Sequence, residues 1–251
     1  MATGPLRRAA RATSPAREGG EDAVSASPPP QSGGGGPPQA VEGAWVRDAA
    51  TFQAATSATP AQMADLEAFR ALLADWNTRL NLVGPSAPAE FWGRHAWDSA
   101  QLLGLAPDAL TWADLGAGAG FPGIVLATLL KDRPGARVHL VESMAKRCRF
   151  LEAVVEALAL PAEVHQARAE ALSLKVDIVA ARACAPASRL FEFAWPYLRK
   201  GARGLFLKGQ DVEAELADAT TYWVFKAQLH PSLSGPTGQI LELKRLARAR
   251  S

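Results

Sequence analysis

One segment of the sequence combines residue types that can hold a small ligand against the main chain. It reads Asp114-Leu115-Gly116-Ala117-Gly118-Ala119-Gly120-Phe121-Pro122-Gly123 and lies between a short apolar run and a helical pattern. Glycine tolerates positive φ, and its missing Cβ lets a ligand approach the backbone closely. A glycine-rich turn between a strand and a helix is typical of sites for nucleotide-like cofactors. The segment therefore predicts a cofactor site at the end of a strand.

The spacing of the glycines narrows the choice of cofactor. Dinucleotide sites carry G-x-G-x-x-G, whereas the sequence from Gly116 reads G-x-G-x-G-F, with Phe121 in the place of the third glycine. A bulky residue there disfavours a dinucleotide and suits a ligand without pyrophosphate, such as S-adenosylmethionine. We therefore expect Gly116, Gly118 and Phe121 to belong to an S-adenosylmethionine site.

Two acids at strand ends complete the predicted cofactor site. Glu142 closes the second expected strand, where an acid can accept hydrogen bonds from both ribose hydroxyls. Asp114 closes the first strand and is placed to face the ammonium group of the ligand, directly or through water. The competing interpretations are a solvated Glu142 at the start of the next helix and a buried or helix-capping Asp114.

The segment after the fourth expected strand bears on the methyl acceptor. Enzymes that methylate exocyclic amines carry a polar loop such as Asn-Pro-Pro-Tyr there, but this chain has Ala181-Arg182-Ala183-Cys184-Ala185-Pro186. Methylation at pyrimidine carbon 5 needs a covalent thiolate. Cys184 lacks the Pro-Cys order of that class and is better interpreted as a packed thiol. Guanine N7 has a lone pair and no proton to lose, so its methylation needs alignment and exclusion of water but no general base. The sequence is consistent with that acceptor without establishing it.

Alternating strands and helices must position these residues. Periodicity and breakers predict strands over 110–115, 137–141, 163–165, 176–181, 204–208, 222–229 and 239–246, with helices over 122–131, 145–159 and 187–198. Such alternation implies a parallel sheet covered by helices on both faces. The last two strands have no helix between them and predict an antiparallel hairpin at one edge. This is the α/β composition of the class I, Rossmann-like methyltransferase fold with seven strands.

The chain divides into three expected parts. Residues 1–58 are rich in Pro, Gly, Ala and Ser, so they bury little apolar surface and predict a disordered leader. Its early arginines faintly resemble a transit peptide, but a dispensable tail or a start codon placed too far upstream is the preferred interpretation. Residues 59–105 predict a helical cap, with a first helix from Pro60 and a second over about 87–103. Residues 106–251 form the expected methyltransferase domain.

Composition excludes several other classes. No run approaches the ~18 apolar residues that a membrane helix needs, and two cysteines cannot build a disulfide framework or a metal cluster. We therefore expect a cytoplasmic protein with no membrane contact and no metal. The formal net charge of +2 is too small to argue for nucleic acid by itself.

Several motifs occur together in one order across about residues 60–246. They are Arg94-His95-Ala96-Trp97-Asp98-Ser99, the glycine loop 114–123, Val141-Glu142-Ser143, Lys146-Arg147, Phe150-Leu151, Arg182-Ala183 and Leu207-Lys208-Gly209. The set resembles the glucose-inhibited division B family (GidB, RsmG), the bacterial small-subunit ribosomal RNA guanine-N7 methyltransferases. The resemblance implies transfer of a methyl group from S-adenosylmethionine to guanine N7 in 16S ribosomal RNA or the small subunit. We expect the chain to act as a monomer.

The resemblance also assigns residues to the site. It places Gly116 and Phe121 in the cofactor pocket, Ala169 and Glu170 beside the adenine, and Arg182 at the border between cofactor and substrate. The family usually has Ser-Arg-Ala-x-Ala where this chain has Ala181-Arg182-Ala183-Cys184-Ala185, so Arg182 is kept and the serine hydroxyl is absent. Gly116-Ala117-Gly118 replaces the usual Gly-Thr-Gly.

Basic residues near the strand ends are candidates for contact with RNA. Lys208 ends the fifth strand and, with Arg182, is expected to position the substrate without acting as a general base. Lys146, Arg147 and Arg149 either contact phosphate or form a solvated helix face. His95 is expected to position the loop and to have no chemical part.

Three other functions remain open at this stage. The cap helices could cover a small pocket, as in a small-molecule or protein methyltransferase. The chain could also be a non-catalytic cofactor-binding module that docks on ribosome precursors. A nicotinamide-dependent oxidoreductase is the least favoured because of Phe121.

Overall fold

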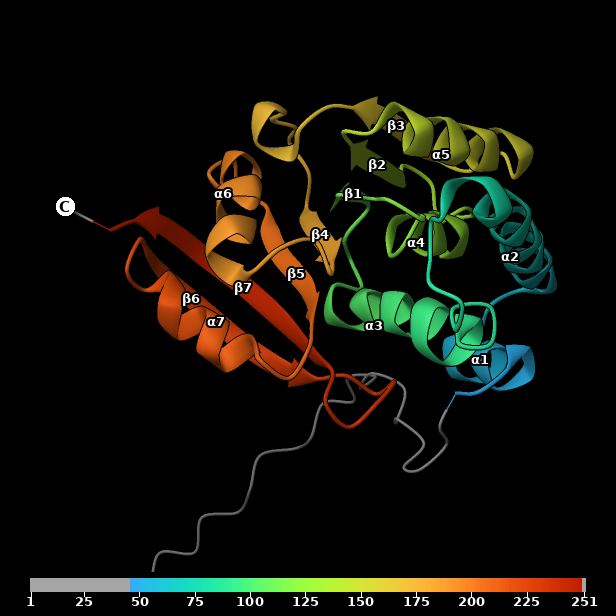
Figure 1. Ribbon diagram of the computed structural model, residues 1–251, viewed down its shortest axis with the longest axis horizontal. Helices are drawn as coiled ribbons and strands as arrows, with labels where there is room; N and C mark the ends of the chain where they lie inside the picture. The colour runs from blue at the N-terminus through green and yellow to red at the C-terminus, as the bar shows by residue number, and fades with distance from the viewer. Residues whose placement is uncertain (1–45, 250–251) are drawn as a thin grey trace, which may run out of the picture. The chain divides into compact units, whose positions relative to one another are not determined.

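A seven-stranded sheet organises the described part of the chain, residues 46–249 of a computed structural model (Figure 1). The strands lie in the order β3-β2-β1-β4-β5-β7-β6. Their bounds are β1 Thr111–Leu115, β2 Arg137–Glu142, β3 Ala162–Gln166, β4 Ile178–Arg182, β5 Arg203–Lys208, β6 Trp223–Pro231 and β7 Gln239–Arg248. Strands β1 to β5 are parallel, and β7 runs antiparallel to both β5 and β6. The strand order reverses between β1 and β4, which is the point where open α/β sheets bind ligands.

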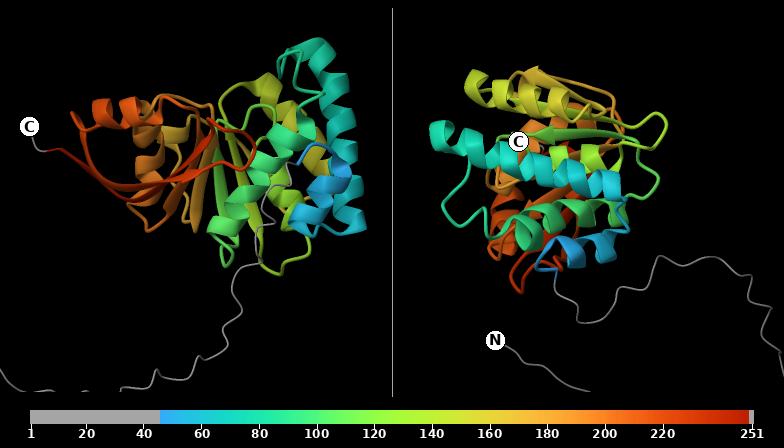
Figure 2. Two further views of the ribbon diagram at one scale, coloured as in Figure 1. Left: turned by 90° about the horizontal axis from the view of Figure 1, so that it is seen from below. Right: turned by 90° about the vertical axis from the view of Figure 1, so that its right-hand side faces the viewer.

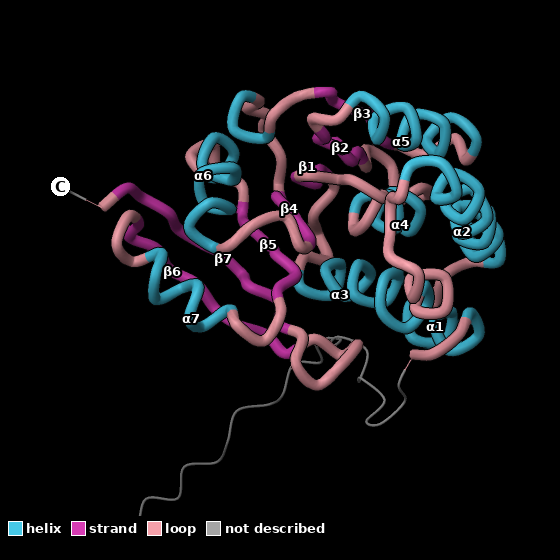
Figure 3. The backbone as a smooth tube through the Cα atoms, in the orientation of Figure 1, coloured by secondary structure: helices cyan, strands magenta, loops and turns pink. Residues whose placement is uncertain are grey.

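Helices cover both faces of the sheet, as the strand pattern predicts (Figure 2). Trp112 and Ala113 are adjacent in β1 and face opposite sides. Trp112 packs in a core that includes side chains of α2, α4 and α5, and Ala113 packs in a core with α6 and α7. The helix bounds are α1 Ala49–Thr56, α2 Pro60–Leu80, α3 Trp97–Leu105, α4 Gly123–Leu129, α5 Ala145–Ala157, α6 Ala187–Leu198 and α7 Val212–Ala219. Figure 3 separates the strands from the flanking helices by colour.

The start of the described chain corrects one expectation. Residues 46–58 were assigned to the disordered leader, but α1 forms there and buries Phe52 completely. Asp48 and Thr51 make a capping box that satisfies the first backbone amides of α1. Phe52 packs against Trp92 at a ring-centroid distance of 5.2 Å. One large apolar residue with a good cap therefore orders a segment whose average composition predicts disorder. Residues 1–45 of the expected leader lie outside the described residues.

The expected helical cap does not have a core of its own. Leu66 and Phe69 of α2 share one hydrophobic cluster with Ile124 of α4 and Phe150 of α5. The second expected helix is in fact a π-helical turn, Phe91–Ala96, that continues into α3. The boundary at residue 105, between the helical cap and the methyltransferase domain, therefore stays a prediction from the sequence.

Two further features of the described residues complete the fold. Helix α7 was not predicted, because most of its residues are small or acidic and only Val212 and Ala219 are buried.

The antiparallel pairing of β6 and β7 confirms the expected hairpin. Among the described helices, none has the length and apolar character needed to cross a membrane.

Candidate active site

The glycine loop after β1 has a backbone path that needs glycine. Gly116, Gly118 and Gly120 have φ values of 71°, 52° and 92°, which side chains with a Cβ rarely adopt. A Cβ on Gly116 would lie 2.9 Å from the sulfur of Cys184. The amide of Gly116 also donates to the carbonyl of Val141 at 2.8 Å. The loop is therefore attached to β2 and stays close to the chain that follows β4.

Glu142, at the end of β2, is held by backbone amides. Its side chain is 4% exposed, so the interpretation as a solvated acid is wrong. One carboxylate oxygen accepts from Gly118 N at 3.0 Å and the other from Met144 N at 2.8 Å. Arg147 lies 3.8 Å from the same carboxylate. A carboxylate has about four acceptor positions, so Glu142 keeps capacity to accept from a ligand with two hydroxyl groups.

A hollow of about 120 Å³ opens beside the glycine loop and Glu142. Its lining contains four of the predicted cofactor residues, Gly116, Glu142, Ala169 and Glu170, together with Val141, Ser143, Ala167, Arg168, Cys184 and Phe193. A larger hollow of about 450 Å³ lies elsewhere, between the start of the described chain and Glu90, Gly93 and Arg94. The smaller hollow is the better cofactor site, because only it joins the glycine loop to a buried acid.

Asp114 lies near the end of β1, as expected, and its carboxylate caps a helix. It is buried, and its Oδ2 accepts from Gly123 N at 2.8 Å, which caps the start of α4. Burial raises the pKa of Asp114 to about 7. Its Oδ1 has no hydrogen-bond partner among the described residues. The helix-capping interpretation therefore describes the structure, and Oδ1 remains able to accept from a ligand donor.

Arg182 lies on the other side of β1 from Glu142 and joins an aromatic cluster. Its guanidinium sits over the ring of Phe121, 5.6 Å from the centroid, and contacts Nδ1 of His95. Phe121 packs against Phe69 at 5.3 Å and does not line the small hollow. One guanidinium nitrogen of Arg182 and Nε2 of His95 are buried without a partner among the described residues. These two groups can hydrogen-bond a further molecule without breaking an existing bond.

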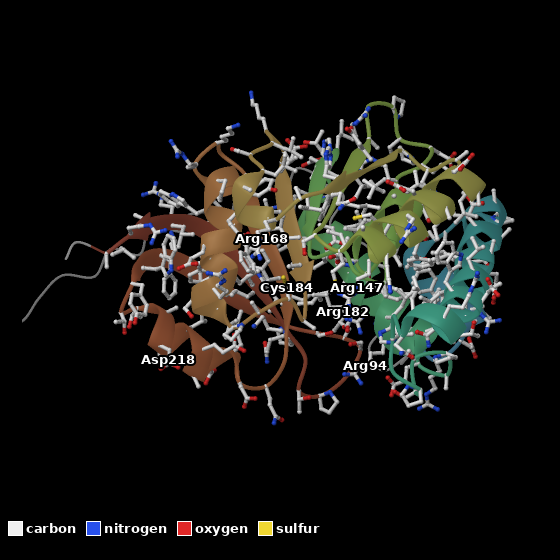
Figure 4. All side chains as sticks on the ribbon, turned by 45° about the horizontal axis from the view of Figure 1, so that its top comes forward. Arg94, Arg147, Arg168, Arg182, Cys184 and Asp218 are labelled. Atoms are coloured by element: carbon white, nitrogen blue, oxygen red, sulfur yellow. The ribbon has the colours of Figure 1, made fainter. Side chains whose placement is uncertain are left out.

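Electrostatics fixes the charge states around Arg182. Burial is the main reason that the pKa of His95 falls to about 3, and the charges of Arg182 and Arg94 add to this effect. His95 is therefore neutral near pH 7. Burial also lowers the pKa of Arg182, but a guanidinium stays protonated at neutral pH. In the view of Figure 4, Arg168 is labelled above Cys184, and Arg147 and Arg182 are labelled to its right, with Arg94 further below, whereas Asp218 of α7 lies apart.

Lys208 and Cys184 are engaged by the protein itself. The ammonium of Lys208 pairs with Glu215 at 2.5 Å and donates to the carbonyl of Ala185 at 2.9 Å, and the side chain is 8% exposed. It thus ties α7 to the chain after β4, and contact with substrate would require this pair to open. Burial, together with Asp114 and Glu142, raises the pKa of Cys184 to about 11, which supports the interpretation as an unreactive thiol.

Sequence reasoning missed some of the lining residues. Ser143 follows β2, and Ala167 and Arg168 follow β3, so the rule that ligands bind at the carboxyl ends of parallel strands could have found them. Phe193 comes from the middle of α6, and no motif points to it. Asp98, which belongs to the Arg94–Ser99 motif, accepts from Ser232 Oγ at 2.8 Å and so holds the turn between β6 and β7.

The sheet order, the glycine loop after β1 and the acid ending β2 define the class I S-adenosylmethionine-dependent methyltransferase fold. A solved structure from Klebsiella pneumoniae, described as a candidate O-methyltransferase, shows the same fold with a TM-score of 0.51 at 12% identity, covering 78% of this chain and 95% of that one.

The family follows from sequence comparison. The family model GidB, described as rRNA small subunit methyltransferase G, matches residues 62–240. The chain is 62% identical over 213 residues to ribosomal RNA small subunit methyltransferase G of Caulobacter sp. (strain K31), covering 85% of this chain and 96% of that protein. It is 45% identical over 187 residues to the protein of the same name in Bradyrhizobium sp. (strain ORS 278), covering 73% and 84%. The chain belongs to the GidB family, which confirms the resemblance.

Proposed function

We propose that this protein transfers the methyl group of S-adenosylmethionine to N7 of a guanine in 16S ribosomal RNA. The family match over residues 62–240 carries the proposal, because the relatives are named for ribosomal RNA of the small subunit. The protein would act as a cytoplasmic monomer on this RNA or on the small subunit. The names of the relatives do not state which atom is methylated. The assignment to guanine N7 therefore rests on the chemistry of the site.

The residues around the small hollow fit S-adenosylmethionine. Gly116 and Gly118 place no side chain beside the ligand, and Glu142 keeps acceptor capacity for the two ribose hydroxyls. Ala169 and Glu170 would lie beside the adenine. The unpartnered oxygen of Asp114 would accept from the ammonium group. The bound molecule supplies an electrophilic methyl group on a sulfonium centre.

The arrangement at Arg182 suits an acceptor that has no proton to lose. Guanine N7 attacks through its own lone pair, so the protein has only to align the base and exclude water. Arg182 keeps a donor for an acceptor atom of the RNA, and neutral His95 orients the guanidinium. The ring of Phe121 packs against the face of the guanidinium. Cys184, with its raised pKa, is unsuited to the covalent route used for carbon acceptors.

Exposed cations near the site would attract the RNA backbone. The side chains of Arg94, Arg147 and Arg168 are 62%, 39% and 74% exposed. Phosphate contacts of this kind release counterions, so binding should weaken as salt concentration rises.

The decisive experiment uses small subunits, and separately their naked RNA, from cells that lack this gene. Each is incubated with the protein and labelled S-adenosylmethionine, and digested nucleosides are identified by mass spectrometry. The proposal expects new 7-methylguanosine with the wild-type protein and none with Gly116→Arg, whose side chain would fill the loop. Label in another nucleoside would overturn the N7 assignment. Cofactor binding without any label in RNA would favour a docking module, and methylation of free metabolites would favour a small-molecule enzyme.

A further inference from the structure

Two histidines and a glutamate gather on β2 and β3, and none of them lines the small hollow. His139 lies in β2, and Glu163 and His165 lie in β3. Nδ1 of His139 and Nε2 of His165 are 2.9 Å apart. The carboxylate of Glu163 lies 3.9 Å from the first nitrogen and 3.8 Å from the second. The three donor atoms all lie within 4.8 Å of one another.

The sheet register explains why these side chains meet. His139 pairs with Glu163, and Val141 pairs with His165, so His139, Glu163 and His165 lie on one face of the two strands. Leu140 and Val164, on the opposite face, join the core with α5. The two histidines are 26 residues apart in the sequence, which is far from the spacing of a local metal motif. The parallel pairing of β2 and β3 is what creates the cluster.

We propose that His139, Glu163 and His165 form a binding site for a divalent transition metal, with Zn²⁺ as the best-matched ion. Imidazole nitrogen and carboxylate oxygen are both ligands for zinc, and a two-histidine, one-glutamate set leaves a fourth position for water. Zn–N distances of about 2.0–2.1 Å place two ligand nitrogens about 3.3 Å apart in a tetrahedral site. The two rings therefore need to separate by only a few tenths of an ångström.

The protonation of the cluster is compatible with metal binding. The contact between the rings is an N–H to N hydrogen bond, so at least one ring is neutral. When the metal binds, the proton between the rings moves to the far nitrogen of its own ring, and both facing lone pairs become ligands.

A neighbouring arginine is positioned to orient the carboxylate. Arg137 donates to Oε2 of Glu163 at 2.7 Å, and Oε1 is the oxygen that lies nearer His165. Glu163 can therefore bind the metal through Oε1 and keep the bond from Arg137, as outer-shell partners of metal ligands commonly do. The side chains of His139 and His165 are 13% and 18% exposed, and that of Glu163 is 44% exposed. The site is thus formed by the fold and open to ions from solvent.

A metal at this position would clamp β3, the edge strand, to β2. The chain after β3 continues into Ala167 and Arg168, which line the small hollow. A ligand that binds only the folded protein raises its stability in proportion to the logarithm of its concentration over Kd. Zinc should therefore raise the Tm of the full chain and order the wall of the hollow that follows β3.

The test measures Zn²⁺ binding to the full chain, purified without a polyhistidine tag, by competition with a chromophoric chelator. We expect one equivalent bound by the wild type, with Kd raised at least tenfold in His139→Ala and in His165→Ala. His230→Ala is the matched control, because His230 pairs with Glu242 on the other side of the sheet order and should not change Kd. Glu163→Gln should weaken binding less than either histidine variant.

A second measurement guards against misfolded variants. In wild-type protein with isotope-labelled histidine, Zn²⁺ should shift the ring signals of His139 and His165 together and leave those of His95 and His230 in place. Equal Kd values for His139→Ala and His230→Ala, or ring signals of His139 and His165 that do not respond to zinc, would overturn the proposal.

Discussion

The two sides of β1 at the carboxyl edge of the sheet differ in how completely their polar groups are paired. On the glutamate side (Glu142, Gly118 and Met144), the carboxylate is already held by two backbone amides. On the arginine side (Arg182 and His95), two buried ring or guanidinium nitrogens have no partner among the described residues. Burial of an unpaired polar group costs about 1–3 kcal/mol. The glutamate side is therefore preorganised by the fold, and the arginine side stores a cost that a bound molecule can relieve.

This difference suggests a division of labour between the two sides. A preorganised carboxylate suits the cofactor, which binds in the same way in each turnover. Unpaired donors suit a substrate whose contacts strengthen in the transition state. Variants on the two sides should then change different kinetic quantities.

The largest expected effect is on the arginine side. Arg182→Ala should lower kcat by about 10²–10³-fold, a typical loss when one preorganised donor is removed, and change the Kd for S-adenosylmethionine by less than about threefold. Arg70→Ala, which removes an exposed arginine of α2 paired with Glu67, is the control for the loss of one positive charge. Single-turnover kinetics and calorimetry separate the two quantities. A large rise in cofactor Kd with unchanged kcat would place Arg182 in the cofactor site instead.

The next effect is on the glutamate side. Glu142→Gln keeps the size of the side chain but removes its charge, and a hydrogen bond to a charged group contributes about 1.5–3 kcal/mol. We expect the Kd for S-adenosylmethionine to rise by about 10–100-fold, with kcat at saturating cofactor nearly unchanged. Calorimetric titration gives Kd directly. If kcat fell as strongly as affinity, the proposed division between the two sides would be wrong.

A smaller effect is expected at Lys208, next to the arginine side. Because its ammonium pairs with Glu215, Lys208→Met and Glu215→Gln should each lower kcat/KM by a similar factor, about fivefold, through the loop after β4. Both variants should also lower the Tm. Methylation assays on small-subunit RNA compare them. A much larger loss in Lys208→Met, with a weaker salt dependence than in Glu215→Gln, would indicate direct contact with RNA.

The smallest effect is on the pH dependence of stability, where Asp114 and His95 oppose each other. The pKa of Asp114 is raised from 3.8 to about 7, so the folded state binds a proton more readily and the free energy of unfolding falls as pH rises from about 4 to 7. The pKa of His95 is lowered from 6.5 to about 3. The unfolded state then binds the proton more readily, and the free energy of unfolding rises with pH across about 3 to 6.5.

Single substitutions should expose each contribution by urea denaturation at a series of pH values. Asp114→Asn leaves the contribution of His95, so its stability relative to the wild type should fall on acidification from pH 7 to 4. His95→Gln should show the opposite trend. Each slope has an upper bound of about 1.4 kcal/mol per pH unit. Parallel curves for wild type and both variants would show that these two groups do not titrate with the shifts given above.

Much of the cofactor side was predictable from local patterns. The glycine loop, the acid ending β2 and the alternation of strands and helices are all short-range features, and each was placed within a few residues of its position in the structure. The helix α1 was missed because its stability comes from one buried ring, Phe52, and a cap, which average composition does not reveal. The role of Asp114 was left between two alternatives, since the choice depends on whether Gly123 N reaches its carboxylate.

The sequence by itself determined the fold class, the family and the chemistry of the cofactor loop, because periodicity, glycine positions and strand-end acids act over short stretches of chain. Only the tertiary structure decided which side chains meet. It packed Phe121 beneath Arg182, engaged Lys208 with Glu215, and brought His139 beside His165. These contacts join residues far apart in the chain, and their geometry is set by strand register and helix packing, which no local pattern encodes.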